Sequence, residues 1–320
     1  MWTCLAQGLP SDVNSSRPPT HDPWMPPSAY CLTAVPLALT LNLLVLGVNL
    51  GQRASMMLPD VYFTNMSLAS FVLAIVSTWR LLGGSWAWSG QPCLALYVLF
   101  NVSSLVFVYS AVLLGLDYFV ELSLASVQLS SAYQPRHVCE FLWGGSALAS
   151  LSSLLSYACI KLAPSPLECA SLQTGELGDA ILFFVGFLVP LVAAVYSLVL
   201  IGRLHKEEEP SPFLCPRPQP QLLRLLAGTA PLTLLLWLPY HCSLLLDLLQ
   251  SLQGGGGRPR EAEPETWAAF KVASEVLGYA SGWAVPVLYL TLRPQFWDRF
   301  WRTKAHIARH LPPLRGTAPV

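Results

Sequence analysis

The stretch CLALYVLFNVSSLVFVYSAVLLGL, residues 93–116, contains no Asp, Glu, Lys or Arg. A helix needs about 20 apolar residues to cross the hydrocarbon core of a bilayer. This stretch is therefore long enough to span a membrane. The charged residue Asp117 follows directly after it.

Charge-free stretches of similar length recur along the whole chain. They predict seven transmembrane helices near 30–51, 59–82, 93–120, 138–161, 177–203, 222–249 and 267–291. The composition agrees with this prediction: 53% of the 320 residues are hydrophobic and only 11% are charged. A soluble domain carries about 25% charged residues. The net charge is zero, which gives no support to a nucleic-acid partner. We expect an all-α membrane protein, a seven-transmembrane helix bundle.

The distribution of basic residues orients the predicted helices. With the N-terminus outside, twelve of the 18 Lys and Arg residues fall on the cytoplasmic side, as the positive-inside rule requires. Asn14 begins an Asn-Ser-Ser glycosylation sequon in the outer tail. We expect a multi-pass plasma-membrane glycoprotein with an extracellular tail over 1–29, a transmembrane domain over 30–291 and a cytoplasmic segment over 292–320.

The segment after the last span is aromatic and basic. Phe296, Trp297, Phe300 and Trp301 form one stripe at helical spacing, surrounded by the basic residues Arg299, Arg302, Lys304 and Arg309. This pattern predicts a short amphipathic eighth helix that lies on the inner leaflet and contacts membrane lipids.

Four cysteines lie outside in this topology, where disulfides persist. Cys93 and Cys169 are expected to form a bridge over the mouth of the bundle, with two free thiols as the alternative. For Cys4 and Cys31, a second bridge and two free thiols both stay open.

Two prolines interrupt the last two spans: Pro239 in LLLWLPYH (234–241) and Pro286 in GWAVPVLYL (282–290). Each removes a backbone hydrogen bond and kinks its helix, which creates a hinge or a static curve. They complete an ordered set of residues, which is Asn42, Cys93, Asp117, Trp143, Cys169, Pro190, Trp237, Pro239, Pro286 and Tyr289. This set resembles the rhodopsin-like G-protein-coupled receptors and covers nearly the whole chain. The resemblance implies a receptor for an extracellular ligand that engages a heterotrimeric G protein, an arrestin or both.

The sequence departs from that family at the cytoplasmic end of the third span. The family usually carries Asp-Arg-Tyr where this chain has Asp117, Tyr118 and Phe119. The acid that pairs with the Arg in many members is replaced by Gln219. Both residues of the usual Arg–acid ion pair are therefore absent, which implies atypical G-protein coupling. The expected intracellular switch consists of Asp117, Tyr118, Pro239, Pro286 and Tyr289.

The sodium site that many members of the family contain is also altered. Ser70 stands in place of the buried Asp, and the positions of its polar partners hold Phe107, Ser281 and Val285. We expect no sodium site and no other metal.

A ligand pocket is expected in the outer half of the bundle. Glu275 lies inside the seventh span, and an intramembrane acid is a functional-site hypothesis by default. In the family fold Arg80 is its natural partner, either as a structural ion pair or in ligand binding, and Lys271 one turn away competes for the same carboxylate. Further candidates by helical spacing are Tyr97, Asn101, Ser104, Trp237, Tyr240 and His241. Phe100 stands where amine receptors carry an Asp, which disfavours a monoamine ligand.

Two other classes of function compete with the receptor. The absence of the usual Arg–acid ion pair favours a non-signalling scavenger or trafficking protein of the same fold. A transporter or intramembrane enzyme is disfavoured, because the spans carry no nucleophile–base pair or metal-ligand set. We therefore expect no enzymatic activity and no cofactor.

Overall fold

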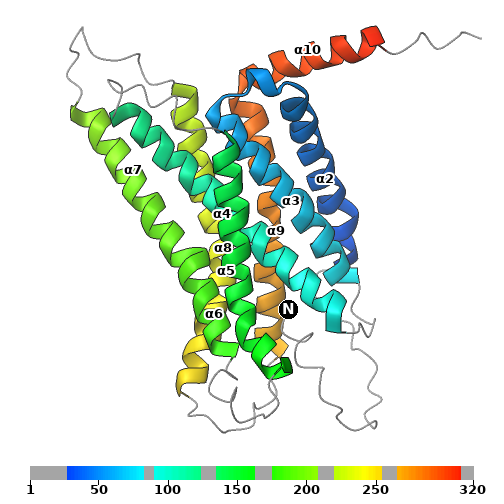
Figure 1. Cartoon of the computed structure of the whole chain (residues 1–320), viewed down its shortest axis with the longest axis vertical. Helices are drawn as coiled ribbons and strands as arrows, with labels where there is room; N and C mark the ends of the chain where they lie inside the picture. Colours follow the sequence, from blue (N-terminus) through cyan, green and yellow to red (C-terminus); the bar gives the residue numbers. More distant parts are fainter. Residues whose placement is uncertain are drawn as a thin grey trace, which may run out of the picture.

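Each predicted span forms one long helical rod in the computed structural model, which describes residues 27–82, 90–123, 135–162, 175–207, 220–253 and 265–310 (Figure 1). The rods are α2 (Pro27–Gly51), α3 (Leu58–Leu82), α4 (Gly90–Ser123), α5 (Pro135–Leu162), α6 (Gly175–Phe183) with η4 (Phe184–Leu188) and α7 (Val189–Glu207), α8 (Pro220–Gln253) and α9 (Glu265–Leu292). The described residues contain no strand, and the predicted all-α fold class is confirmed.

The rods match the predicted spans but several are longer. α4 and α8 have 34 residues each, whereas about 20 are needed to cross the bilayer core. A helix does not end where the hydrocarbon ends, so charge-free stretches mark the buried part and not the helix boundaries. Five helical rods of the described residues are long and apolar enough to cross a membrane: α2, α3, α4, the rod formed by α6, η4 and α7, and α8.

Neighbouring rods pack side by side to form the bundle. α2 contacts α3 and α9, α4 contacts α3, α5, α7 and α8, and α8 packs along α9. After α9, the helix α10 (Pro294–His310) turns away from the bundle axis and lies across one end of it (Figure 1). It touches α2 as well as α9, with Gly51 beside Thr303. We call this end of the bundle the α10 end.

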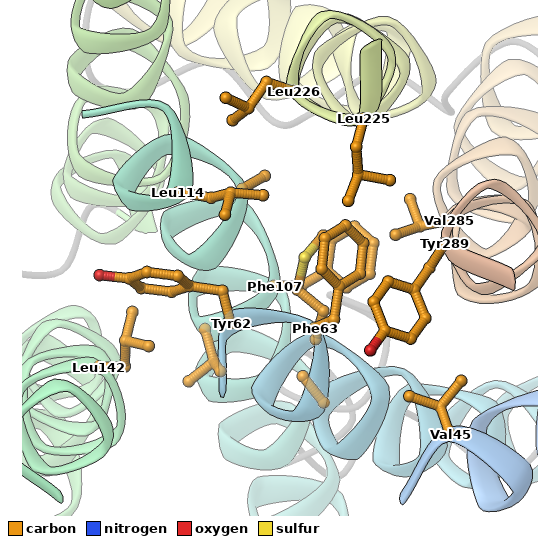
Figure 2. Close-up of a cluster of buried hydrophobic side chains, with 14 of the residues drawn as sticks. Val45, Tyr62, Phe63, Phe107, Leu114, Leu142, Leu225, Leu226, Val285 and Tyr289 are labelled. Atoms are coloured by element: carbon orange, nitrogen blue, oxygen red, sulfur yellow. The ribbon is translucent and has the colours of Figure 1, made fainter. Parts of the chain in front are cut away.

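The largest buried apolar cluster lies in the half of the bundle near the α10 end. Phe63, Phe107, Val285 and Tyr289 converge there from three helices (Figure 2), and all are at most 1% exposed. The outer surface is also apolar, with Leu148 71% exposed on α5 and other large apolar side chains exposed on α2 and α7. Lipid covers such a surface in a membrane, so apolar residues are favourable on both faces of these helices.

Pro286 and Pro190 lack a backbone N–H inside the bundle. At each position a side chain from another helix donates the hydrogen bond that the proline does not provide. Pro286 has no N–H to donate to the Gly282 carbonyl four residues earlier, and Asn42 Nδ2 of α2 donates to that carbonyl at 2.7 Å. Around η4 the backbone bonds run from residue i+5 to i, as from Val189 N–H to the Phe184 carbonyl.

In that register the Val185 carbonyl would accept from Pro190, which has no N–H. The Tyr109 hydroxyl of α4 donates to it at 2.7 Å instead. An unsatisfied backbone group costs several kcal/mol in lipid, so both side chains stabilise the rods that contain these prolines. Trp143 of α5 makes a different interhelical contact, since its indole N–H donates to the side-chain Oδ1 of Asn65 in α3 at 2.9 Å.

Candidate functional site

A buried cluster of charges connects α3, α9 and α10 at the α10 end. Asp60, in the first turn of α3, is 1% exposed and accepts hydrogen bonds from two arginines. Arg293 Nε lies 3.2 Å from Asp60 Oδ1, and Arg299 Nη1 lies 2.8 Å from Oδ2. The Met57 backbone N–H also donates to Oδ2, at 3.0 Å. Burial lowers the pKa of the Arg299 guanidinium, but the hydrogen bond and charge of Asp60 raise it above its usual value, so Arg299 stays cationic.

Tyr289 joins this cluster to the part of α9 that follows Pro286. Its hydroxyl donates to Asp60 Oδ1 at 2.8 Å and accepts from Arg299 Nη2 at 3.1 Å. Asn49 Nδ2 of α2 lies 3.4 Å from the same oxygen. The ring stacks on Phe63 with centroids 4.4 Å apart. Tyr289 is three residues after Pro286, so any pivot of α9 at that proline would move a side chain held by three other helices. We call Asp60, Arg293, Arg299, Tyr289 and Asn49 the Asp60 network.

The sequence interpretation of α10 was wrong in one respect. Arg299 was expected among the basic residues around a single aromatic stripe, but it is 5% exposed and faces the bundle. Phe296 is fully buried and meets Tyr289 edge to face, whereas Trp297 and Trp301 are 40% and 57% exposed. The stripe is therefore divided between the bundle and the outside. The spacing i, i+3 of Phe296 and Arg299 was the signal that could have placed both on one face.

Asp117 and Tyr118 also lie near the α10 end, but outside the Asp60 network. Asp117 accepts a hydrogen bond from the Tyr62 hydroxyl of α3. Tyr118 is 4% exposed and belongs to the same buried cluster as Leu225 and Leu226 of α8. The ring thus stands in the apolar core between helices, where a charged Arg side chain would require a partner. Pro239 lies halfway along α8.

The opposite half of the bundle holds an aromatic cluster that contains several of the predicted pocket residues. Phe100 of α4 contacts Tyr240 at 5.7 Å and Trp237 at 6.1 Å between ring centroids, both on α8. Tyr279 of α9 meets Phe100 edge to face at 6.0 Å, and Tyr97 belongs to the same cluster. These rings bring α4, α8 and α9 together.

A small cavity lies beside the aromatic cluster, between α4, α6 and α8. Its volume is about 10 Å³, and Asn101, Ser104, Tyr240 and His241 contribute its polar lining. Asn101 is 2% exposed and His241 5%. Asn101 Nδ2 and His241 Nδ1 have no hydrogen-bond partner among the described residues. The structure therefore brings together four of the predicted residues that the sequence placed on two different spans.

Lys271, one of the predicted charged residues of the pocket, contacts two residues that the sequence did not single out. Lys271 pairs with Asp247 of α8, with 2.8 Å between Nζ and Oδ2, and its ammonium lies 5.5 Å from the centre of the Trp267 ring. Trp267 also donates to Asp247 Oδ1 at 3.2 Å. Glu275 is buried, with 8% exposure. Asp247 and Trp267 were missed because each lies at the end of its span, where polar residues are unremarkable in a sequence.

Several predictions fall outside the described residues and stay predictions. These are the glycosylation of Asn14, the pairing of Cys93 with Cys169, the side chain of Arg80 and the role of Gln219. Cys31 carries a free thiol, and Cys4 is not among the described residues.

At the position of the family's sodium site, two of the four side chains are apolar and two are serines. Phe107 and Val285 are buried in the main core cluster, and the Ser281 hydroxyl accepts a hydrogen bond from the Trp237 indole at 3.2 Å. The same hydroxyl donates to the Gly278 carbonyl at 2.6 Å.

The comparisons with known proteins agree with this architecture. Residues 41–289 match the sequence profile of the family described as 7 transmembrane receptor (rhodopsin family). The chain is similar to G-protein coupled receptor 146 of Mus musculus, with 37% identity over 89% of this chain and 87% of the relative. It is also similar to G-protein coupled receptor 146 of Xenopus laevis, with 34% identity over 85% and 83%.

A more distant relative is G-protein coupled estrogen receptor 1 of Danio rerio, with 22% identity over 84% of this chain and 76% of the relative. The family profile covers most of the bundle, from Leu41 in α2 to Tyr289 in α9. With its helical rods and its match over most of their length, the chain belongs to the rhodopsin family of seven-transmembrane receptors.

Proposed function

We propose that this protein is a plasma-membrane receptor with its N-terminus outside, which transmits the binding of an extracellular ligand to a cytoplasmic G protein or arrestin. The α10 end is then cytoplasmic, and the aromatic cluster lies in the outer half. The ligand is unknown; a monoamine is disfavoured because Phe100 fills the position of the amine-binding Asp and is 1% exposed.

The Asp60 network is the observation that carries this proposal. It holds α3, α9 and α10 through one carboxylate, two guanidinium groups and the Tyr289 hydroxyl, all at most 5% exposed. A buried charge that loses its partner is strongly destabilised, by about 3–5 kcal/mol. We therefore expect the Asp60 network to have two stable states: a closed state with these contacts intact, and a state in which they are all rearranged. Intermediate arrangements would leave a buried charge without a partner. That property suits a switch that a ligand biases by binding one state more tightly.

The route from ligand to switch runs along α8 and α9. Trp237 of α8 donates to Ser281 of α9, five residues before Pro286. A displacement of the outer aromatic cluster would be passed to α9 through this bond, and a pivot at Pro286 would pull Tyr289 from Asp60. A parallel pivot of α8 at Pro239 would separate Leu225 and Leu226 from Tyr118 and open a cytoplasmic cleft.

Coupling to G proteins is proposed to be atypical because Tyr118 replaces the Arg that contacts G protein in the family. The Tyr118→Arg variant should therefore increase G-protein activation per receptor at the cell surface. No change in that assay would count against this part of the proposal.

The Asp60→Asn variant tests the switch. It keeps the shape of the side chain but leaves Arg293 and Arg299 without a counter-charge, which destabilises the closed state. Each loss of about 1.4 kcal/mol raises the ratio of open to closed receptors about tenfold. Basal G-protein activation or arrestin recruitment, measured per receptor at the surface, should rise. Asp298→Asn is the matched control, because Asp298 is exposed on the same α10 helix. Equal basal signals in Asp60→Asn, Asp298→Asn and wild type would refute the switch.

The alternative function is a non-signalling scavenger or trafficking protein of the same fold. The replacement of the family's Arg by Tyr118 favours it, because this position then offers no Arg that could contact a G protein. Internalisation of the wild type together with silent G-protein and arrestin assays for every variant would support this alternative.

A further inference from the structure

α8 is bound to α9 near the outer end of the bundle and again in its middle. Asp247 of α8 pairs with Lys271 of α9, with 2.8 Å between Oδ2 and Nζ. Halfway along, the Trp237 indole N–H of α8 donates to the Ser281 hydroxyl of α9 at 3.2 Å, and a Cβ on Gly278 would lie 3.3 Å from the same indole ring. Separating the two helices at either level would leave polar groups without a partner inside the membrane, which is costly.

The same two helices are also in close contact at the α10 end. A Cβ on Gly228 of α8 would lie 2.9 Å from Leu288 Cδ2 of α9, so no side chain fits at Gly228 unless Leu288 moves. Small residues that let two helices approach this closely favour their association in lipid. Gly228 stands 19 residues before Asp247, which is about 28 Å along the helix. The contacts between α8 and α9 therefore cover nearly the full thickness of the bilayer core.

The contacts of α8 with α4 at the α10 end are of a different kind. Leu225 and Leu226 of α8 belong to the main core cluster together with Leu114 and Tyr118 of α4 (Figure 2). Lipid tails are as apolar as a leucine side chain, so acyl chains can replace these contacts at little cost. Within the described residues, α7 contacts α8 sparsely. At this end, separation of α8 from α4 therefore costs less than separation of α8 from α9.

We infer that α8 and α9 move as one rigid pair, so that the cytoplasmic end of α8 leaves α4 only when Tyr289 leaves Asp60. Leu288, which contacts Gly228, directly precedes Tyr289, and the Tyr289 hydroxyl donates to Asp60 Oδ1 at 2.8 Å. An outward displacement of Gly228 therefore carries Tyr289 away from the carboxylate. The Asp60 network, whose residues lie on α2, α3, α9 and α10, thereby holds α8 against α4 through α9.

The rigid pair makes opening of the bundle a single event. A ligand that displaces α8 must also supply the free energy that separates Tyr289 from Asp60, and it can do so only by binding the open state more tightly. The inference rests on the proposed function for this role, but the movement of the helices is measurable without any signalling.

The experiment measures how fast a charged, water-soluble maleimide labels single reporter cysteines in the full chain in lipid nanodiscs. Leu226→Cys reports on the contact between α8 and α4, and Leu288→Cys reports on the contact between α8 and α9. Leu142→Cys, on α5 in the same core cluster, reports on general loosening of the bundle. Peptide mass spectrometry reads each reporter separately from the native cysteines.

Asp60→Asn is introduced into each reporter chain to open the Asp60 network. Labelling of Leu226→Cys should become at least about tenfold faster, the change in open fraction that about 1.4 kcal/mol produces. The rates of Leu288→Cys and Leu142→Cys should not change, because the helix pair stays together and α5 does not take part. Asp298→Asn, at an exposed site of α10, is the matched control and should leave all three rates unchanged.

The inference is overturned if Asp60→Asn leaves the rate of Leu226→Cys unchanged, because the network would then not hold α8. It is also overturned if labelling of Leu288→Cys accelerates as much as that of Leu226→Cys, because α8 would then have left α9. Should Asp60→Asn not fold, Tyr289→Phe replaces it. This variant removes the hydroxyl that bonds Asp60, keeps the ring stacked on Phe63 and should accelerate labelling of Leu226→Cys about threefold.

The labelling and signalling assays separate this inference from the proposed function. Faster labelling of Leu226→Cys together with silent signalling assays would support the helix pair and refute the receptor. A raised basal signal of Asp60→Asn with an unchanged labelling rate would refute the helix pair and leave the receptor function intact.

Discussion

Tyr109→Phe removes one hydroxyl from the contact between α4 and the π-helical turn η4. The hydroxyl donates to the Val185 carbonyl at 2.7 Å, where Pro190 has no N–H to offer. Interhelical hydrogen bonds in membrane proteins contribute about 0.6 kcal/mol on average and up to about 1.7. A buried acceptor left unsatisfied costs about 1–3 kcal/mol. We expect Tyr109→Phe to lower the free energy of unfolding by about 1–2 kcal/mol.

The physical reason can be tested by restoring the missing donor. Pro190→Ala provides a backbone N–H five residues after Val185, in the register that Val189 and Phe184 already use. In this background the Val185 carbonyl no longer depends on Tyr109. In this background, Tyr109→Phe should lower the free energy of unfolding by less than half as much as it does in the wild-type chain. A double-mutant cycle measures this coupling directly.

The assay is reversible unfolding of the purified chain in mixed detergent–SDS micelles. Tyr196→Phe is the control for loss of a tyrosine hydroxyl, because Tyr196 is 60% exposed on α7 and faces outward. Its free energy of unfolding should equal that of the wild type. Equal costs of Tyr109→Phe in the wild-type chain and in the Pro190→Ala variant would show that the hydroxyl does not act through the proline-freed carbonyl.

Three further variants probe other contacts by the same unfolding assay or by hydrogen exchange. Asn42→Leu removes the donor to the Gly282 carbonyl and should cost about 1–3 kcal/mol of unfolding free energy, whereas Thr40→Val, at an exposed site of the same helix, should cost much less. Gly278→Ala would place a Cβ 3.3 Å from the Trp237 indole and should cost about 1–3 kcal/mol by overpacking, whereas Gly47→Ala meets nothing within 4 Å and should not destabilise. Phe296→Ala removes a fully buried ring and should speed amide exchange throughout α10, an effect that Trp301→Ala at an exposed site should not produce.

The arrangement of helices along the chain was readable from the sequence because the bilayer imposes one simple requirement on it. Each span must be about 20 residues long and nearly free of charge. The seven charge-free stretches met that requirement, and the ordered prolines and tryptophans identified the family. The boundaries were less accurate, as α4 shows, because it begins at Gly90 and ends at Ser123 rather than at residues 93 and 120.

The Asp60 network was not predicted, although each of its residues is visible in the sequence. Asp60 stands at the start of a span, where a charge is expected to reach water. Its partner Arg299 lies 239 residues further along, and no periodic pattern joins the two. The tyrosine was identified as a switch from the family motif, but the groups that hold it were not.

The difference between what was predicted and what was missed follows from the solvent. In water, the apolar pattern of a helix selects the face that packs inside, because burial is favourable there. In lipid, apolar contact is available on every face, so it does not choose among helix rotations. Polar groups do determine the rotation of a helix, because each of them requires a hydrogen-bond partner inside the bundle. Asn42 on the Gly282 carbonyl, Tyr109 on the Val185 carbonyl and Asp60 on its two arginines therefore fix how the rods are rotated and staggered. Those pairs join distant parts of the chain, so helix positions follow from the sequence more readily than the contacts on which the proposed switch depends.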